Sequence, residues 1–90
     1  MTTEQQSAAL AIKKAAGLLR KVQTMLDENA YCIDVMQQNL AVIGLLKSAH
    51  QSLLEGHLNS CVSSAISAGN VSKKKKMIDE VIRVSKLAAK

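Results

Sequence analysis

The sequence predicts an all-α fold, a three-helix protomer with one very long central helix. The 90 residues include no proline and four glycines, so few positions interrupt a helix. Apolar residues make up 48% of the chain and recur every three or four positions, as in an amphipathic helix. Tyr31 is the single aromatic residue, so the core must be aliphatic. One small domain, residues 1–90, cannot close a core over helices this long, which predicts burial by oligomerisation.

The first helix is expected over residues 3–27. Thr3 and Gln6 fit a capping box, in which two side chains satisfy free backbone amides at the helix start. Gly17 lies in the helix interior, where it lowers helix propensity and permits a close helix crossing. The supporting apolar stripe consists of Ala8, Ala11, Ile12, Ala15, Leu18, Leu19, Val22, Met25 and Leu26. Residues 27–30 form a short turn, with Asn29 as the cap of the next helix.

The second helix is expected over residues 31–67. At the α-helical rise it would be about 55 Å long, which exceeds a domain of this size. Gly44 and Gly56 weaken it without breaking it, since one glycine costs only about 1 kcal/mol. In the second turn, Gly69 ends the long helix and Ser72 caps the third, which covers residues 73–88.

The net charge of +5 favours a polyanion partner, nucleic acid before anionic lipid, over ordinary solubilising charge. Lys73, Lys74, Lys75 and Lys76 occupy the first turn of the third helix, where the macrodipole disfavours cations. This run is either solvated or meets a phosphate backbone. The sequence has no apolar run that could span a membrane and no secretory signal at its N-terminus. Two cysteines in such a chain indicate reduced thiols and a cytoplasmic location.

Three soft metal-ligand candidates, Cys32, His57 and Cys61, lie along the predicted long helix. His57 and Cys61 are four residues apart and share a helix face. Cys32 would lie about 44 Å from Cys61, so neither a metal ion nor a disulfide joins them within one chain. They can share an ion only where two subunits run antiparallel. Two thiolates and one imidazole favour a soft ion, Cu(I) foremost; the alternative is two core cysteines and a surface histidine.

The segments that carry these ligands resemble a known family. They read Tyr-Cys-Ile-Asp-Val at residues 31–35 and Leu-Leu-Glu-Gly-His-Leu-Asn-Ser-Cys-Val at residues 53–62, preceded by Met-Leu-Asp-Glu at residues 25–28. They are similar to the CsoR-type family of copper-sensing transcriptional repressors, and the resemblance covers nearly the whole chain. It implies an antiparallel dimer that pairs into a flat tetramer, with Cu(I) held by Cys32 of one subunit and by His57 and Cys61 of the other.

The resemblance also implies a function. Such a repressor is not an enzyme: it binds operator DNA without metal and leaves it when Cu(I) binds, so that copper-resistance genes are expressed. Tyr31 and Glu80 match positions that contact the ligating histidine in the family. Independently of the resemblance, the sequence lacks the glycine-rich phosphate loop and the carboxylate pair that would favour an enzyme.

The first helix departs from the family pattern, because Ala16 and Leu18 replace its usual Glu and Gln. Positive charge remains for phosphate contact at Lys13, Lys14, Arg20, Lys21, Lys73 and Lys74. Two other functions stay open. One is a thiol or persulfide sensor of the same fold, in which Cys32 and Cys61 of different subunits are joined. The other is a metal-buffering helical protein without DNA binding.

Overall fold

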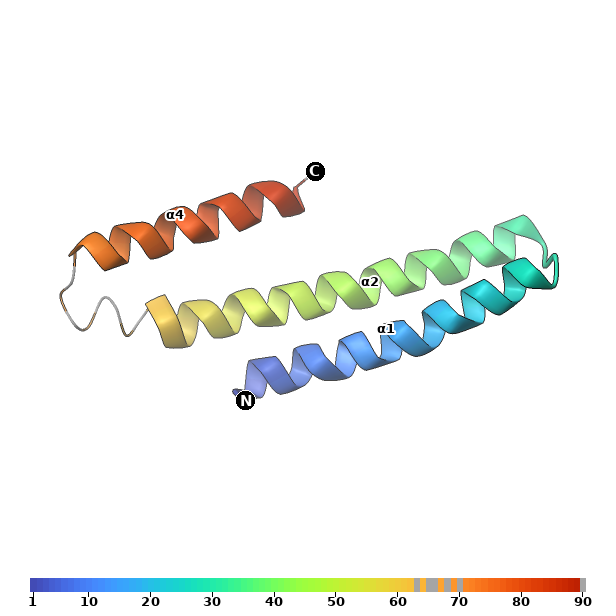
Figure 1. Ribbon diagram of the computed structural model, residues 1–90, viewed down its shortest axis with the longest axis horizontal. Coiled ribbons are helices and arrows are strands. Elements are labelled where there is room, and N and C mark those ends of the chain that lie inside the picture. Colours follow the sequence, from blue (N-terminus) through green and yellow to red (C-terminus); the bar gives the residue numbers. More distant parts are fainter. Residues whose placement is uncertain (63, 65–66, 68, 70, 90) are drawn as a thin grey trace. The chain divides into compact units, whose positions relative to one another are not determined.

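The computed structural model describes residues 1–62, 64, 67, 69 and 71–89, and every regular element in this part of the chain is helical (Figure 1). The elements are α1 (Thr3–Asp27), α2 (Cys32–His57), the π-helical turn η1 (Leu58–Val62) and α4 (Val71–Ala88). The predicted all-α fold with three helices and a long second helix is therefore confirmed. The chain divides into two compact units, Met1–Leu53 and Leu54–Lys90, which are described separately.

The cap of α1 lies one residue earlier than the sequence analysis predicted. Thr2, not Thr3, is the N-cap: its Oγ1 accepts a hydrogen bond from the Gln5 amide at 3.1 Å. The Gln5 side-chain oxygen in turn accepts from the Thr2 amide at 2.9 Å, which completes the capping box. The predicted pair, Thr3 and Gln6, had the same spacing but the wrong register. The error arose because two adjacent threonines, each followed by glutamine three residues later, satisfy the same pattern.

A Schellman motif ends α1. The amide of Ala30 donates to the carbonyl of Met25 at 2.9 Å, and the amide of Asn29 donates to the carbonyl of Leu26 at 3.2 Å. Asn29 adopts φ of 56°, the left-handed conformation that this motif requires. Asn29 therefore terminates the first helix, and its expected role as N-cap of the second is wrong.

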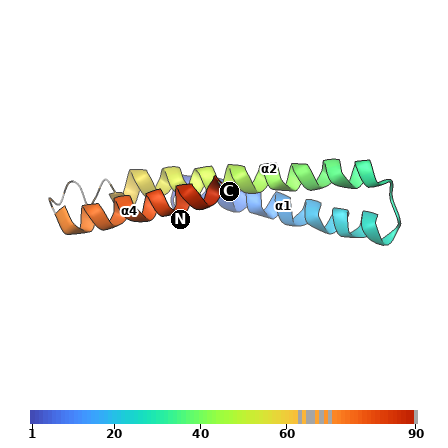
Figure 2. The ribbon, with the colours of Figure 1, turned by 90° about the horizontal axis from the view of Figure 1, so that it is seen from above.

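Helices α1 and α2 form an antiparallel hairpin within the first unit (Figures 1 and 2). The buried positions recur every seven residues, at Ala8, Ala15 and Val22 in α1 and at Val35, Val42 and Ala49 in α2. In an antiparallel pair these spacings match Ala15 with Val42 and Val22 with Val35, and these four side chains form one core cluster. A seven-residue period is that of a coiled coil. The fully buried positions of this seam are alanine and valine, and the larger side chains of Leu18, Met25 and Leu45 are partly buried against it.

The sequence analysis predicted that the second helix runs to residue 67, and this prediction is wrong for the α-helix. It ends at His57, and Leu58–Val62 form a π-helical turn with wider i→i+5 hydrogen bonding. Within the second unit, α4 packs against this turn. The remainder of the predicted helix includes residues 63, 65 and 66, which lie outside the described part of the chain.

The predicted second turn is confirmed at Gly69, whose φ of 70° is left-handed. Ala68 and Asn70 lie outside the described residues. Since α4 begins at Val71, Ser72 belongs to its first turn and is not the cap that the sequence predicted. Among the described residues, no helix combines the length and apolar character needed to cross a membrane.

Candidate metal centre and basic surface

Cys32 is the first residue of α2, and its free thiol is exposed. Tyr31 precedes the helix, and its carbonyl accepts a hydrogen bond from the Val35 amide at 3.2 Å, as the first acceptor of the helix does. Tyr31 is 69% exposed. Both side chains named by the sequence analysis at this end of α2 are thus available to an additional partner.

His57 and Cys61 lie at the other end of α2. His57 is its last residue and is half-buried, and the backbone of Cys61 belongs to η1. The side chain of Cys61 is outside the described part of the structure. The expected α-helical spacing between the two ligands is corrected, because a π-helical turn starts directly after His57. Turns of this kind are rare and occur frequently at functional sites.

The length of α2 decides whether one chain can build the site. A helix of 26 residues is about 39 Å long, and Cys32 and His57 are its terminal residues. Among the described side chains, which do not include that of Cys61, there is no group of three or more His, Cys, Asp or Glu that could hold a metal ion. The donor set itself suits a soft ion, since it offers two sulfurs and an imidazole nitrogen. These residues therefore fit Cu(I) only if a second chain brings opposite ends of two α2 helices together.

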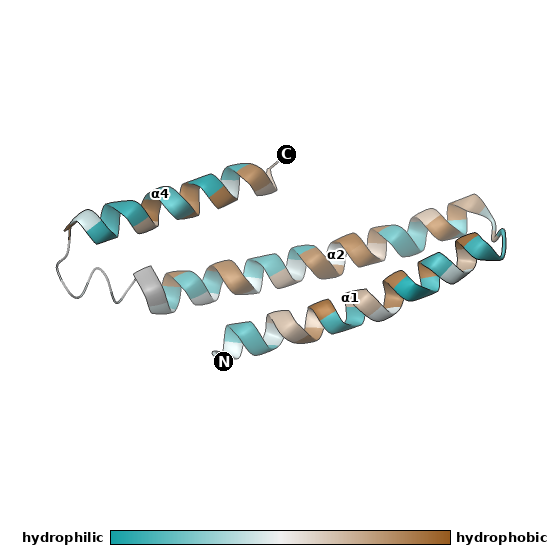
Figure 3. Ribbon diagram, viewed as in Figure 1, coloured by the Kyte–Doolittle hydropathy of each residue, from teal (hydrophilic) through white to brown (hydrophobic). Residues whose placement is uncertain are grey.

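Large apolar side chains are exposed along both helices of the hairpin, and Figure 3 shows hydrophobic segments along the length of α1 and α2. We call the set given below the apolar face. Leu40, for example, is 65% exposed. The face consists of Ile12, Leu19 and Leu26 in α1 and of Ile33, Met36, Leu40, Ile43, Leu46 and Leu53 in α2. Its side chains recur at seven-residue spacing, next to the buried seam. In α2, the row of Met36 and Ile43 continues by the same spacing through His50 to His57.

The predicted basic residues of α1 lie on other rows. Lys13 and Arg20 form one seven-residue row and Lys14 and Lys21 the next, and all four side chains are exposed. Successive residues of an α-helix are about 100° apart around its axis, so both basic rows lie on other sides of α1 than the apolar row that begins with Ile12. We call these four residues the basic patch. Burial of the apolar face would thus leave the basic patch accessible.

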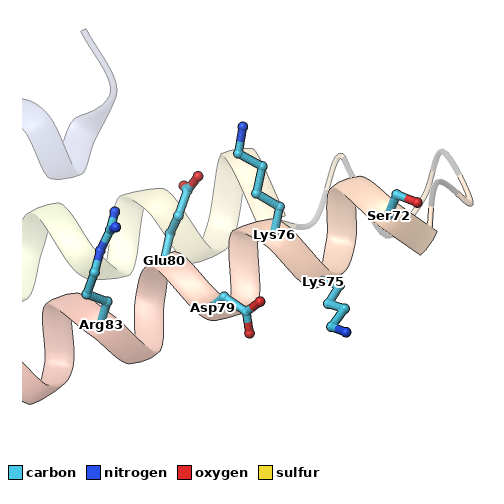
Figure 4. A pocket seen from close by; sticks show the side chains of 6 residues that line it. All are labelled: Ser72, Lys75, Lys76, Asp79, Glu80 and Arg83. Atoms are coloured by element: carbon cyan, nitrogen blue, oxygen red, sulfur yellow. The ribbon is translucent and has the colours of Figure 1, made fainter.

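Helix α4 carries the remaining candidates. Lys73 and Lys74 are exposed in its first turn, and Glu80 is half-buried. A shallow hollow along α4 is lined by charged side chains, with Lys76, Glu80 and Arg83 pointing to one side of the helix and Lys75 and Asp79 to the other (Figure 4). Glu80 is thus placed on a charged helix face, and its predicted contact with His57 stays a prediction.

Residues 4–86 match the model of a protein family described as metal-sensitive transcriptional repressor. The chain belongs to the metal-sensitive transcriptional repressor family. The resemblance drawn from the cysteine and histidine motifs is therefore confirmed. Members of this family are regulators of transcription, so the expectation of a non-enzymatic protein is confirmed as well.

Two curated relatives and one solved structure resemble this repressor. It is 30% identical to the copper-sensing transcriptional repressor RicR of Mycobacterium tuberculosis, over an alignment of 86 residues that covers 96% of this chain and 90% of the relative. It is 37% identical over 82 residues to the copper-sensing transcriptional repressor CsoR of Mycobacterium ulcerans, covering 91% of this chain and 68% of the relative. The crystal structure of the copper-sensing repressor CsoR with Cu(I) from Geobacillus thermodenitrificans matches with a TM-score of 0.87 and 34% identity, over 100% of this chain and 92% of that one.

The sequence analysis missed one feature of this surface and misinterpreted another. It treated the apolar residues of each helix as one stripe and so missed the separation of a small-residue seam from an outer apolar face. The seven-residue spacing of Ala8, Ala15 and Val22 was the available signal. It also predicted that Gly17 permits another helix to cross α1 closely. Among the described residues, the one atom near a Cβ built there is Nη2 of Arg20, on the same helix at 3.7 Å.

Proposed function

We propose that the protein is a Cu(I)-responsive transcriptional repressor that binds operator DNA without metal and releases it when Cu(I) binds. Cys32 of one subunit and His57 and Cys61 of its antiparallel partner would hold the ion. The released DNA would carry genes for copper resistance. The proposal includes a cytoplasmic location, where thiols stay reduced.

The single observation that carries the proposal is the position of soft ligands at opposite ends of α2. Cys32 begins this helix and His57 ends it. In two antiparallel copies, the Cys32 sulfur of one copy would therefore lie beside the His57 imidazole of the other. A pair of this symmetry forms two equivalent sites. When bound, Cu(I) would crosslink two subunits through sulfur and nitrogen ligands. The two curated relatives and the solved structure are all named as copper-sensing repressors, which supports the choice of metal.

The apolar face supports the antiparallel dimer. Contiguous exposed apolar surface on a soluble protein marks an interaction site, and here it runs along both helices of the hairpin. A twofold axis across this face would pack α2 against α2 of the partner, as the shared metal site requires. Pairing of two dimers into a tetramer is part of the same proposal.

The basic patch supports binding to DNA. Its four side chains are exposed and can neutralise phosphates, and Lys73 and Lys74 add positive charge on α4. Contacts of this kind position a protein on the duplex, and they make the affinity fall steeply with salt.

The imidazole of His57 offers a route from the metal site to the rest of the chain. When one of its nitrogens binds a metal, the other carries an N–H that donates to an acceptor, and outer partners of this type tune metal sites. Glu80 of α4 and the hydroxyl of Tyr31 are the groups that we propose for this role. An effector shifts DNA affinity only through such a difference between the two states of the protein.

The test combines two titrations of the full-length protein. X-ray absorption of the Cu(I)-loaded protein should report sulfur and nitrogen neighbours at one ion per subunit. The same loading should weaken binding to DNA from upstream of the gene by about tenfold or more, within the range of measured allosteric coupling. Unchanged DNA affinity with the site filled would contradict the proposal. A Cys32–Cys61 crosslink after persulfide treatment, together with DNA release, would instead identify a thiol sensor.

A further inference from the structure

Gly17 lies at the centre of the basic patch. On an α-helix the nearest surface neighbours of a residue are those three and four positions before and after it, at about 5–6 Å between Cβ atoms. For Gly17 these four neighbours are Lys13, Lys14, Arg20 and Lys21, so every one of them is a cation. No other glycine of the chain has such surroundings.

This positive charge is not compensated on its own helix. Residues 5–26 contain no acidic side chain, and Glu4 and Asp27 stand at the two ends of α1. On the facing helix α2, Asp34 and Glu55 are close to its two ends. The middle of α1 is therefore a concentrated region of positive potential, to which an anion is attracted.

The glycine is not explained by the fold. Its φ is not left-handed, since Gly69 is the one glycine with positive φ among the described residues. No other described helix approaches it, because a Cβ at this position meets only Nη2 of Arg20, at an ordinary contact distance of 3.7 Å. Glycine inside a helix lowers its stability relative to alanine. What glycine does provide here is bare backbone at the bottom of a ring of four cationic side chains.

We propose that Gly17 forms the floor of a phosphate site, in which one phosphodiester group of duplex DNA is seated between Lys13, Lys14, Arg20 and Lys21. The missing side chain lets the phosphate approach the helix surface closely enough for all four cations to reach it. The guanidinium of Arg20 already lies over Gly17 and offers paired N–H donors of the geometry that phosphate accepts. This inference rests on the proposed DNA binding and adds the position that seats the DNA backbone.

Gly17→Gln and Gly44→Gln form a matched pair for the test. Gly44 also lies within a helix, with nothing within 4 Å of a built Cβ, and its corresponding neighbours are Leu40, Ala41, Lys47 and Ser48. Glutamine is a good helix former and carries no charge, so both variants should melt at or above the temperature of the wild type. Circular dichroism and sedimentation would verify the folded, assembled state of both.

The probe is a random-sequence DNA duplex of about 30 base pairs, titrated at several salt concentrations, because phosphate binding is independent of sequence. Gly17→Gln should weaken binding about tenfold, the size of one charge-assisted hydrogen bond. The slope of log affinity against log salt should become shallower by about one unit for each phosphate that the variant no longer neutralises. Gly17→Ala should show a smaller reduction in affinity, and Gly44→Gln should bind like the wild type. Cu(I) stoichiometry should stay unchanged in all variants.

The outcomes separate the two proposals. If the wild type binds the duplex and Gly17→Gln binds it equally well with the same salt slope, the phosphate site is wrong and the repressor function stands. Equal weakening by Gly44→Gln also overturns the site, because the effect would then follow from any change of a helix glycine. If the wild type binds no duplex at all, both the site and the proposed DNA binding fall.

Discussion

His57 and His50 make a useful comparison at the scale of single residues. They are seven positions apart on the same row of α2, and both are half-buried. Only His57 has a cysteine four positions later, and only His57 is followed directly by the π-helical turn. The chemistry proposed for the metal therefore depends on one of two histidines of the same row and similar burial.

Replacement of His57 by alanine should abolish the response to Cu(I) and leave DNA binding without metal intact. Loss of a direct ligand should lower Cu(I) affinity by more than the 10–100-fold, roughly, that follows from loss of an outer partner. Competition with a Cu(I) chelator would measure this affinity, and a gel-shift titration would measure release of DNA. His50→Ala is the control and should behave like the wild type. Equal losses of Cu(I) affinity in both variants would indicate that these histidines act through the structure of α2, and this would contradict the assignment of His57 as a ligand.

At the scale of elements, the boundaries of α1 show how side chains define a helix. Thr2 and Gln5 satisfy each other's backbone amides at its start, and Asn29 adopts the left-handed conformation at its end. The sequence predicted α1 with the correct bounds, Thr3–Asp27. It did not decide which of two adjacent threonines is the cap, because both fit the same spacing and only the backbone conformation distinguishes them.

The corrected cap leads to a stability prediction. Thr2→Ala should lower the free energy of unfolding by about 0.5–1 kcal/mol per subunit, since it removes the acceptor of the Gln5 amide. Thr3→Ala should leave it unchanged or raise it slightly, because Thr3 lies within the helix and alanine has the higher helix propensity. Urea unfolding followed by circular dichroism, at one protein concentration, would compare them. A larger decrease for Thr3→Ala would return the cap to the register that the sequence first suggested.

At the scale of the whole molecule, the hairpin divides its side chains among three surfaces. Buried alanine and valine with partly buried Leu18, Met25 and Leu45 form the seam. Other large aliphatic residues form the apolar face, and cations form the basic patch. Many large apolar side chains of both helices remain exposed, so further hydrophobic stabilisation is available outside the single chain. Oligomerisation would recover it and would leave the basic patch free for DNA.

A charge introduced into the apolar face should break the assembly. Ile43→Glu places a carboxylate on the surface that we propose to be buried between subunits, where an unpaired charge is costly. Sedimentation should show dissociation of the dimer, and Cu(I) binding should disappear with it because a single chain cannot bring its three ligands to one ion. Gln37→Glu, an exposed position of the same helix, is the matched control and should assemble normally. A dimeric Ile43→Glu variant with intact Cu(I) affinity would rule out the proposed interface.

The residue motifs determined more of the site than of its surroundings. Cys32, His57 and Cys61 were predicted as ligands from donor chemistry and spacing, which are properties of the sequence, and their joint site stays a prediction. The same spacing on one long helix predicted that no single chain completes the site, and the length of α2 agrees with that prediction. The π-helical turn could not be predicted, because Leu58–Val62 has no proline or glycine that marks a change of helix type.

The sequence by itself determined that this protein is helical, basic and provided with side chains of soft donor chemistry, because helix period, charge and donor atoms are fixed residue by residue. Only the tertiary structure decided which apolar residues are buried. Packing of α1 against α2 selects the rows whose side chains are small enough for close approach, at Ala8, Ala15, Val42 and Ala49 among others. The same packing leaves other large apolar side chains exposed, and it leaves Gly17 half-buried among four cations, with the Arg20 guanidinium beside it.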